Sequence, residues 1–348
     1  MKKLILIALA AVLAACGQSP KGSGREKLAG AGATFPLPYY NLAIKTYRDS
    51  VPAEVSYGGI GSGGGIRSLK DRIVDFAGSD AYLTDAEMAT MPDSVIHIPT
   101  CMGAVVMAYN LPGVEKLKLT GELVADIYLG KITRWNDARI RGINPGVQLP
   151  DLEIHPVYRS DGSGTTFVFS DYLTKVSPAW KETIGAGKSL EWPAGLAAKG
   201  NPGISGTVSQ TEGAVGYIGS EYAFAQHISY ASLQNKAGRF IDPTLESISA
   251  AAAGDLPTDT RCMITDPDAA DAYPISCFTW ILLYKEQGYD KRTREQSEAL
   301  VDLLGWMLGS QAQDLAGKVN YAPLPQQVID NGRAQLGTVT YKGEKLLK

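Results

Sequence analysis

Three short segments combine glycine with serine or threonine directly before a stretch that favours a helix: GAGATFPLPYY at 30–40, GGIGSGGGIRSL at 58–69 and RSDGSGTTFVFSDYL at 159–173. The first N–H groups of a helix have no intrahelical acceptor, and the helix dipole adds partial positive charge at that end. Glycine lets the backbone approach a ligand closely. Each segment therefore favours an anion site, although turns of this kind also commonly only cap helices.

Arg159 distinguishes the third segment from the other two. It stands two residues before Asp161 and four before Ser163, so its guanidinium is expected beside the turn Ser163-Gly164-Thr165. A planar fork of N–H donors suits a tetrahedral oxyanion. Asp161 is then expected to hold the arginine as an ion-pair partner; the alternative is that it caps the following helix, and both can hold.

The elements that must position these residues follow from apolar patterning. Short apolar runs predict buried strands, which alternate with helical stretches and favour an α/β architecture. The clearest helix is expected at 292–309, where leucine and methionine recur with helical spacing. The predicted strands lie at 74–79, 103–109, 153–158 and 278–284.

The mature chain beyond the tether has about 320 residues, more than a typical single core, so two domains are expected. We find no repeat and no long linker. A second domain must therefore arise where the chain crosses over and later returns. The apolar strands at 103–109 and 278–284 are the candidate crossovers.

The first residues predict export. Lys2 and Lys3 precede an apolar run at 4–12 of about ten residues, half of the roughly twenty that span a bilayer as a helix. The run ends in Leu-Ala-Ala before Cys16, which resembles the lipobox of bacterial lipoproteins. We therefore expect residues 1–15 to be a removed signal peptide, Cys16 to be lipidated, and residues 16–27 to be a flexible tether.

Composition and spacing exclude several classes of partner. Removing Lys2 and Lys3 lowers the basic residues from 33 to 31 against 36 acidic ones, which argues against nucleic acid or anionic lipid. The histidines and cysteines lack the paired spacing of metal ligands, so no metal is expected. Glycines at 59, 61 and 64 match a dinucleotide fingerprint, but the helix after them is too short, so no cofactor is expected.

The cysteines leave one alternative open. Cys101 lies in an apolar run and is expected to be a core thiol. Cys262 and Cys277 either form a disulfide, because an exported protein meets an oxidising compartment, or remain buried thiols.

Seven motifs together resemble the periplasmic phosphate-binding proteins of phosphate-specific ABC transporters. The resemblance rests on GAGATFP, YGGIGSGGG, DFAGSDA and RSDGSGTTFVF, and is extended by DIYLGKITRWND, GAVGYI and YPIS over nearly the whole mature chain. Gly63 departs from the family, which often has a second serine there. SDAYL and FAGSD also differ slightly from the family pattern.

The resemblance implies a set of phosphate contacts. Asp80 would accept a hydrogen bond from the ligand's own P–OH, and thereby select phosphate over sulfate, which carries no proton near neutral pH. The remaining contacts would be Thr34, Phe35 through its N–H, Ser62, Arg159, Ser163, Gly164 and Thr165.

The resemblance also implies the fold and the partners. It predicts a two-domain periplasmic binding protein fold of type II-like α/β architecture, with two crossover hinge strands and the ligand in the interdomain cleft. Domain I would combine 28–104 with 279–348, and domain II would be 105–278. The expected partners are inorganic phosphate and an ABC permease with its ATPase, reached by a monomer that a lipid anchors in the periplasm or at the cell surface.

Three other functions compete with this one. The cleft could bind another oxyanion, such as arsenate, sulfate or molybdate. The chain could be a surface lipoprotein that serves adhesion or sensing. A secreted phosphate-ester hydrolase would need Ser62 or Ser163 as nucleophile, but no histidine lies in the turns that hold these serines and no G-x-S-x-G turn occurs. We therefore expect a binding protein and no enzyme.

Overall fold

The computed structural model describes residues 26–51 and 53–347. Cys16, the predicted signal peptide and most of the predicted tether lie outside these residues. The first strand, β1 (Glu26–Gly32), begins two residues before the predicted start of domain I at residue 28.

An eight-stranded sheet forms the centre of the molecule, with the strand order β2-β1-β3-β11-β4-β8-β6-β7. β1 runs parallel to β2 and β3, and β6 runs parallel to β7 and β8, while β4 and β11 are antiparallel to their neighbours. The sheet thus consists of two parallel halves joined through an antiparallel centre. The bounds are β2 (Ala53–Gly59), β3 (Phe76–Ser79), β4 (Val95–Tyr109), β6 (His155–Arg159), β7 (Leu196–Ala198), β8 (Ala214–Gly219) and β11 (Ser276–Tyr284).

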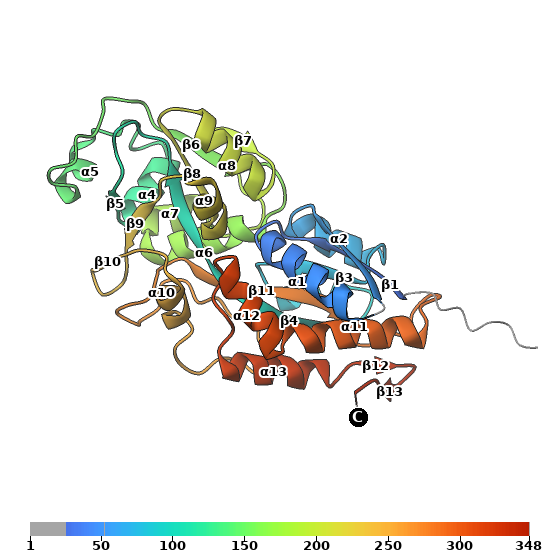
Figure 1. Ribbon diagram of the computed structural model, residues 1–348. Helices are drawn as coiled ribbons and strands as arrows, with labels where there is room; N and C mark the ends of the chain where they lie inside the picture. The colour runs from blue at the N-terminus through green and yellow to red at the C-terminus, as the bar shows by residue number, and fades with distance from the viewer. Residues whose placement is uncertain (1–25, 52, 348) are drawn as a thin grey trace, which may run out of the picture.

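β4 belongs to both halves of the sheet. Its residues 95–104 pair with β11, and from Val105 onward it pairs with β8 instead. Figure 1 shows this strand running from one lobe of the molecule into the other, with β11 beside it. The crossovers predicted at 103–109 and 278–284 lie in β4 and β11.

β4 begins eight positions earlier than the apolar run predicted, at Val95. His97 and Thr100 interrupt the apolar pattern, yet both are buried because they have partners. His97 Nε2 accepts a hydrogen bond from Leu83 N at 2.9 Å, and Thr100 Oγ1 lies 2.9 Å from the hydroxyl of Tyr40. Satisfied polar groups can occupy a buried strand that hydropathy alone would end.

The helices divide between the lobes (Figure 1). The beginning and the end of the chain build one lobe together, and the middle of the chain builds the other. The first lobe has α1 (Leu37–Ser50), α2 (Ser62–Lys70), α3 (Asp85–Met88), α11 (Arg294–Met307), α12 (Ser310–Lys318) and α13 (Gln326–Leu336). The second has α4 (Gly121–Tyr128), α5 (Ala138–Ile143), α6 (Gly164–Val176), α7 (Pro178–Thr183), α8 (Gly200–Gln210), α9 (Ser220–Gln226) and α10 (Leu245–Ala250).

Two small sheets complete the secondary structure of the described residues. A three-stranded sheet has the order β10-β9-β5, and β12 pairs with β13 near the end of the chain. Their bounds are β5 (Leu117–Leu119), β9 (Ala231–Gln234), β10 (Phe240–Ile241), β12 (Thr340–Tyr341) and β13 (Glu344–Lys345).

The helix predicted at 292–309 is confirmed as α11. Thr293 and Gln296 form a capping box at its start, and the apolar face of the helix is buried. The buried positions include Leu300, Leu303, Leu304 and Met307, as the spacing predicted. A capping box satisfies N–H groups that the first turn of a helix leaves free, and it sets the start of α11 at Arg294, two residues after the predicted start.

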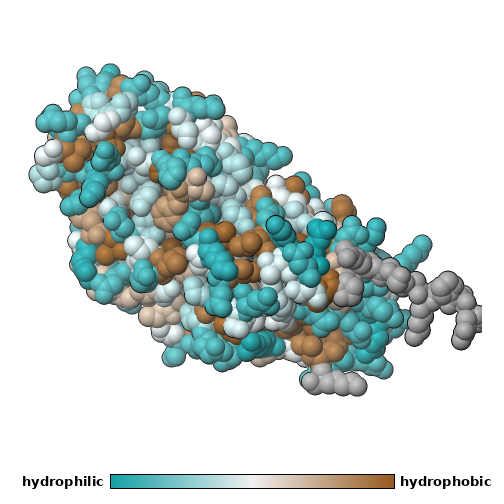
Figure 2. Space-filling model, viewed as in Figure 1, coloured by the Kyte–Doolittle hydropathy of each residue, from teal (hydrophilic) through white to brown (hydrophobic). Residues whose placement is uncertain are grey.

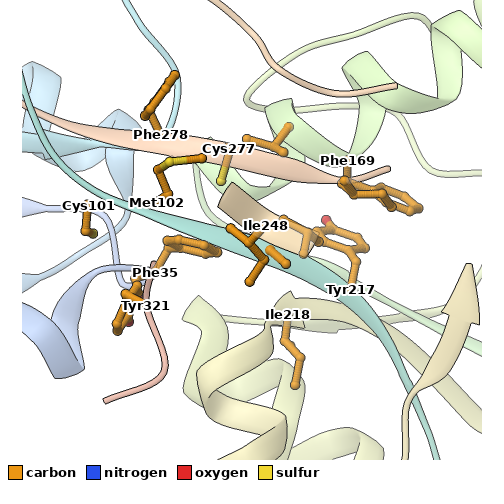
Figure 3. Close-up of a cluster of buried hydrophobic side chains, with 14 of the residues drawn as sticks. Phe35, Cys101, Met102, Phe169, Tyr217, Ile218, Ile248, Cys277, Phe278 and Tyr321 are labelled. Carbon is orange, nitrogen blue, oxygen red and sulfur yellow. The ribbon is translucent and has the colours of Figure 1, made fainter. Parts of the chain in front are cut away.

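A continuous apolar core follows the two central strands through both lobes. Figure 3 shows Phe35, Cys101 and Tyr321 along β4 toward the first lobe, and Phe169 and Tyr217 toward the second. Hydrophilic residues cover most of the face seen in Figure 2, with apolar residues in small separate groups. No helix within residues 26–51 and 53–347 is both long enough and apolar enough to cross a bilayer.

The structure decides between the two predicted states of the cysteines, a disulfide or free thiols. Cys101, Cys262 and Cys277 are free thiols, so the disulfide between Cys262 and Cys277 is wrong. Side chains alternate between the faces of a strand, and Cys277 shares its face with Thr279, which contacts Asp80. Cys262 instead lies beside Phe278, on the opposite face. β11 itself therefore separates the two thiols.

A thiol titration checks this arrangement. In a Cys16→Ser variant unfolded in denaturant without reductant, we expect Cys101, Cys262 and Cys277 all to react with a thiol reagent, because no bond joins any of them. Prior reduction should not increase the number of reactive thiols. Reaction of Cys101 alone before reduction would contradict the structure.

Candidate functional site

The predicted binding residues follow the carboxyl ends of strands in both halves of the sheet. Thr34 and Phe35 follow β1, Ser62 opens α2 after β2, and Asp80 follows β3. In the other half, Arg159 ends β6, and the turn 163–165 opens α6. Parallel strands present their carboxyl ends at one edge, where α/β proteins bind ligands. The two edges meet between the lobes.

Every predicted polar side chain of this group is buried, with an exposed fraction of 5% or less. They are Thr34, Ser62, Asp80, Arg159, Ser163 and Thr165. Buried polar groups need hydrogen-bond partners, and here many of the partners come from the opposite lobe. The hydrogen bonds of each group therefore describe how the lobes fit together.

Ser62 and Gly164 are in direct contact across the boundary between the lobes. The hydroxyl of Ser62 accepts hydrogen bonds from Gly164 N at 3.0 Å and from Asp80 N at 3.4 Å. A Cβ at position 164 would lie 2.5 Å from Ser62 Oγ, so only glycine fits there. Beside them, Gly63 N donates to Gly162 O at 2.9 Å. The glycines thus allow direct contact between the backbones of two lobes.

Arg159 and Asp161 form a buried, two-pronged ion pair. Arg159 Nε lies 2.7 Å from Asp161 Oδ1, and Nη2 lies 2.6 Å from Oδ2. Burial pushes the pKa of Asp161 upward, but the hydrogen bonds and charge of Arg159 outweigh it and hold that pKa below its ordinary value. The pair leaves Nη1 and one Nη2 hydrogen of Arg159 to meet an anion. Ser163, not Asp161, caps α6, which decides between the two predicted roles.

Asp80 carries the acceptor atoms of the site. Its Oδ1 accepts from the Thr279 hydroxyl at 3.1 Å, and its Oδ2 accepts from the Thr165 hydroxyl at 3.2 Å. Burial raises the pKa of Asp80 to about 7, although Thr279, the charge of Arg159 and Thr165 partly offset this rise. The carboxylate of Asp80 therefore has free acceptor positions and lies among groups that donate hydrogen bonds.

Three tyrosines hold the turn after β1. Tyr222 donates to the carbonyl of Thr34, Tyr321 donates to that of Phe35 at 2.5 Å, and Tyr57 donates to that of Ala33 at 2.9 Å. The carbonyl of Thr34 and the N–H of Phe35 belong to one trans peptide, so this N–H points away from Tyr222. The Phe35 ring is buried in the core.

Four residues of this region were not predicted from the sequence: Thr279, Asn201, Lys188 and Glu87. Asn201, at the start of α8, donates to the hydroxyls of Thr34 and Thr165. Lys188 Nζ lies 2.6 Å from Glu87 Oε1 and joins the lobes at the rim. The one signal for Asn201 is its place in Gly-Asn-Pro, a turn sequence that opens a helix.

The two serines considered as nucleophiles both accept hydrogen bonds from backbone N–H groups. Ser163 Oγ accepts from Thr166 N at 3.0 Å as the cap of α6, and none of the hydrogen bonds of Ser62 involves a histidine. The buried His97 has a pKa lowered to about 3, chiefly by burial, and is therefore neutral. Across residues 26–51 and 53–347, no three His, Cys, Asp or Glu side chains gather to hold a metal ion. The geometry favours binding by donated hydrogen bonds.

Comparison with known proteins gives consistent relatives. A family model described as a PBP superfamily domain matches residues 17–311. Phosphate-binding protein PstS of Xylella fastidiosa strain Temecula1 is 40% identical over 308 residues, which cover 87% of this chain and 83% of the relative. The protein of the same name from Pasteurella multocida is 39% identical over 318 residues, 90% of each chain.

Solved structures share the fold. A high affinity periplasmic phosphate-binding protein (PfluDING) bound with phosphate has a TM-score of 0.73 at 22% identity, covering 88% of this chain and 93% of that chain. A putative phosphate ABC transporter substrate-binding protein from Clostridium perfringens has a TM-score of 0.64 at 17% identity, covering 86% and 100%. Both likenesses show the mixed α/β, two-domain fold of periplasmic binding proteins.

The raised pKa of Asp80 predicts how stability depends on pH. Because the folded state binds this proton more tightly than the unfolded chain, the stability that Asp80 contributes is present below pH about 4 and lost as pH rises through about 7. Without added anion, Asp80→Asn should therefore lose less stability than the wild type between these pH values. A pKa shift of one unit corresponds to about 1.4 kcal/mol of unfolding free energy, so urea unfolding at several pH values resolves the effect.

Asp161→Asn serves as the control with the opposite sign. The pKa of Asp161 is lowered, so its contribution is present above the unfolded pKa and is lost as pH falls. If Asp80→Asn followed the same pH curve as the wild type, Asp80 would not hold its proton more tightly in the folded protein.

Proposed function

The chain belongs to the family of the PstS phosphate-binding proteins, and we propose that it binds inorganic phosphate between its two domains for import by an ABC transporter. One observation supports phosphate above other anions: the buried acceptor Asp80 lies in the same cleft as the donor Arg159. A ligand that meets both must accept hydrogen bonds and also donate one.

We propose that the donors of the cleft surround the phosphate oxygens. They are the free N–H groups of Arg159, the N–H groups of Phe35 and Thr165, and the hydroxyls of Thr34, Ser62 and Ser163. In the closed cleft the N–H of Gly164 and the hydroxyl of Thr165 instead donate to Ser62 and Asp80, which line the same site. The burial of these side chains supports this role, because electrostatic hydrogen bonds are stronger away from water. Micromolar binding needs about −8 kcal/mol, which about a dozen modest hydrogen bonds supply after the cost of ordering.

Asp80 would distinguish phosphate from sulfate. Near neutral pH phosphate carries at least one P–OH, which can donate to the carboxylate of Asp80. Sulfate carries no proton, so its oxygens would face the lone pairs of Asp80 without a hydrogen between them. Arsenate carries a hydroxyl as phosphate does, and we expect it to compete for the cleft.

Binding is favoured over hydrolysis. A serine nucleophile needs an adjacent base, but the acceptor positions of Ser62 are filled by N–H groups and Ser163 caps α6. The relatives above carry the name of phosphate-binding proteins, which agrees with this view.

We propose that domain I combines 28–104 with 279–348 and that domain II is 105–278. The change of partner along β4 supports the first boundary, because Ala104 pairs with β11 and Val105 pairs with β8. In this arrangement β4 and β11 are hinge strands. Opening the cleft would separate Ser62 from Gly164 and Asp80 from Thr165, and would expose Asp80.

The setting of the protein is also a proposal. A lipid on Cys16 would anchor the chain to a membrane, and a monomer would deliver phosphate to permease subunits and their ATPase. The family supports a place outside the cytoplasmic membrane. Export of a lipidated form could be tested by labelling cells with a radioactive fatty acid and comparing the wild type with Cys16→Ser.

Calorimetry with two anions tests phosphate recognition. We expect the wild type to bind phosphate and to reject sulfate by roughly 10⁴-fold, because a site built for a ligand hydroxyl rejects an analogue without it. Asp80→Asn should reduce the ratio of the sulfate dissociation constant to the phosphate dissociation constant, since the amide can donate to a sulfate oxygen. Sulfate rejection that stayed unchanged in Asp80→Asn would exclude Asp80 as the selective group.

A Gly164→Ala variant tests whether contact between the lobes is needed. Its Cβ would overlap Ser62 Oγ, 2.5 Å away, so the cleft should fail to close and phosphate binding should weaken by about a hundredfold or more. Gly206→Ala is the matched control, because nothing lies within 4 Å of a Cβ there. Equal affinities for the two variants would show that this approach is not required for binding.

A further inference from the structure

Asn201 connects three parts of the cleft from a fully buried position. Its Oδ1 accepts from Gly219 N at 3.0 Å. Its Nδ2 donates to Thr34 Oγ1 at 3.1 Å and to Thr165 Oγ1 at 3.2 Å. One amide therefore joins the turn after β1 to the start of α6 across the lobe boundary.

Gly219 determines which way the amide of Asn201 faces. A backbone N–H can only donate, so the atom opposite Gly219 N must be the oxygen of the amide. The nitrogen of the amide must then face Thr34 and Thr165. The orientation thus follows from chemistry, which matters because the two ends of an asparagine amide have nearly the same shape.

The hydroxyl of Thr34 has its acceptor positions filled. A hydroxyl oxygen has two lone pairs and one hydrogen. Here Asn201 supplies two donors to it, its backbone N–H at 3.0 Å and its side-chain amide at 3.1 Å. The Thr34 hydroxyl can therefore form a further hydrogen bond only as a donor. Within the described residues no protein group accepts its hydrogen.

The hydroxyl of Thr165 is arranged in a related way. It accepts from the Asn201 amide and donates to Asp80 Oδ2. Because the amide occupies one lone pair, the hydrogen is turned toward the carboxylate. Asp80 accordingly receives hydrogen bonds from Thr165 and Thr279 and remains an acceptor for the ligand.

We propose that Asn201 is a positioning residue that fixes the direction of these two hydroxyls, so that Thr34 donates to the anion and Asp80 accepts from it. The inference rests on the phosphate binding proposed above. Asn201 thus contributes to affinity and selectivity without touching the ligand.

A double-mutant cycle measured by phosphate calorimetry tests this role. Asn201→Ala should weaken phosphate binding by about ten- to a hundredfold, because the Thr34 hydroxyl is no longer held as a donor. In a Thr34→Ala background the same change should cost several-fold less, since one of the two hydroxyls that Asn201 orients is gone and only its effect through Thr165 remains. A purely structural residue would instead have the same effect in both backgrounds, which would overturn the proposal.

Asn201→Asp repeats the cycle if the alanine variant does not fold. Aspartate keeps the volume of asparagine and the oxygen that faces Gly219, but it removes the donor. Repulsion between the new charge and phosphate persists in the Thr34→Ala background, so it cancels from the coupling. Equal losses in the two backgrounds would again overturn the proposal.

Asn144→Ala is the matched control for a buried asparagine. Asn144 bonds only to backbone groups, at Lys118 and Ile140. This variant should lower the thermal unfolding midpoint and leave phosphate affinity unchanged. A wild type that bound no phosphate would overturn the proposed function together with the inference, whereas additive losses in a phosphate-binding protein would overturn the inference alone.

Discussion

A carboxyl group buried next to an anion site must be surrounded by donors, and the fold around Asp80 supplies them from distant parts of the chain. Thr279 reaches it from β11, and Thr165 reaches it from α6 in the other lobe. The β4 strand makes this arrangement possible, because it holds both halves of the sheet in fixed register. Burial raises the pKa of Asp80, and the hydrogen bonds from Thr279 and Thr165 partly offset this rise.

The donors and acceptors that the cleft leaves free for a ligand follow from the hydrogen bonds within the protein. N–H groups fill the lone pairs of Ser62 and Thr34, so their hydroxyl hydrogens are left to point at a ligand. Arg159 adds N–H groups that its ion pair with Asp161 does not use. Asp80 opposes this set of donors with acceptor atoms. Positive charge alone would not distinguish phosphate from sulfate, since Arg159 attracts any oxyanion.

Much of the fold and of the site could be predicted from local sequence. The turns with glycine, serine and threonine are local features, and the burial of Thr34, Ser62 and Thr165 agrees with them. The length of β4 was underestimated because His97 and Thr100 find partners that hydropathy does not reveal. The resemblance to a family, and not periodicity, identified Asp80 as part of the site.

The remaining features depend on contacts between distant residues. Asn201 and Thr34 stand 167 positions apart, so no local pattern could pair them. The spacing of Cys262 and Cys277 suited a disulfide, but spacing does not reveal that β11 presents Cys277 and Phe278 to opposite faces. Such facts become visible only when the register of the strand is known.

The place of β11 in the sheet has a consequence for how the protein is made. Asp80 and Thr279 are 199 positions apart, so the carboxylate is synthesised long before its partner on β11 leaves the ribosome. The second half of the sheet comes from one continuous stretch of the chain and can assemble early. The first half must wait for nearly the whole polypeptide. A nascent chain therefore keeps its first strands incomplete, with an exposed edge, until the final quarter of translation.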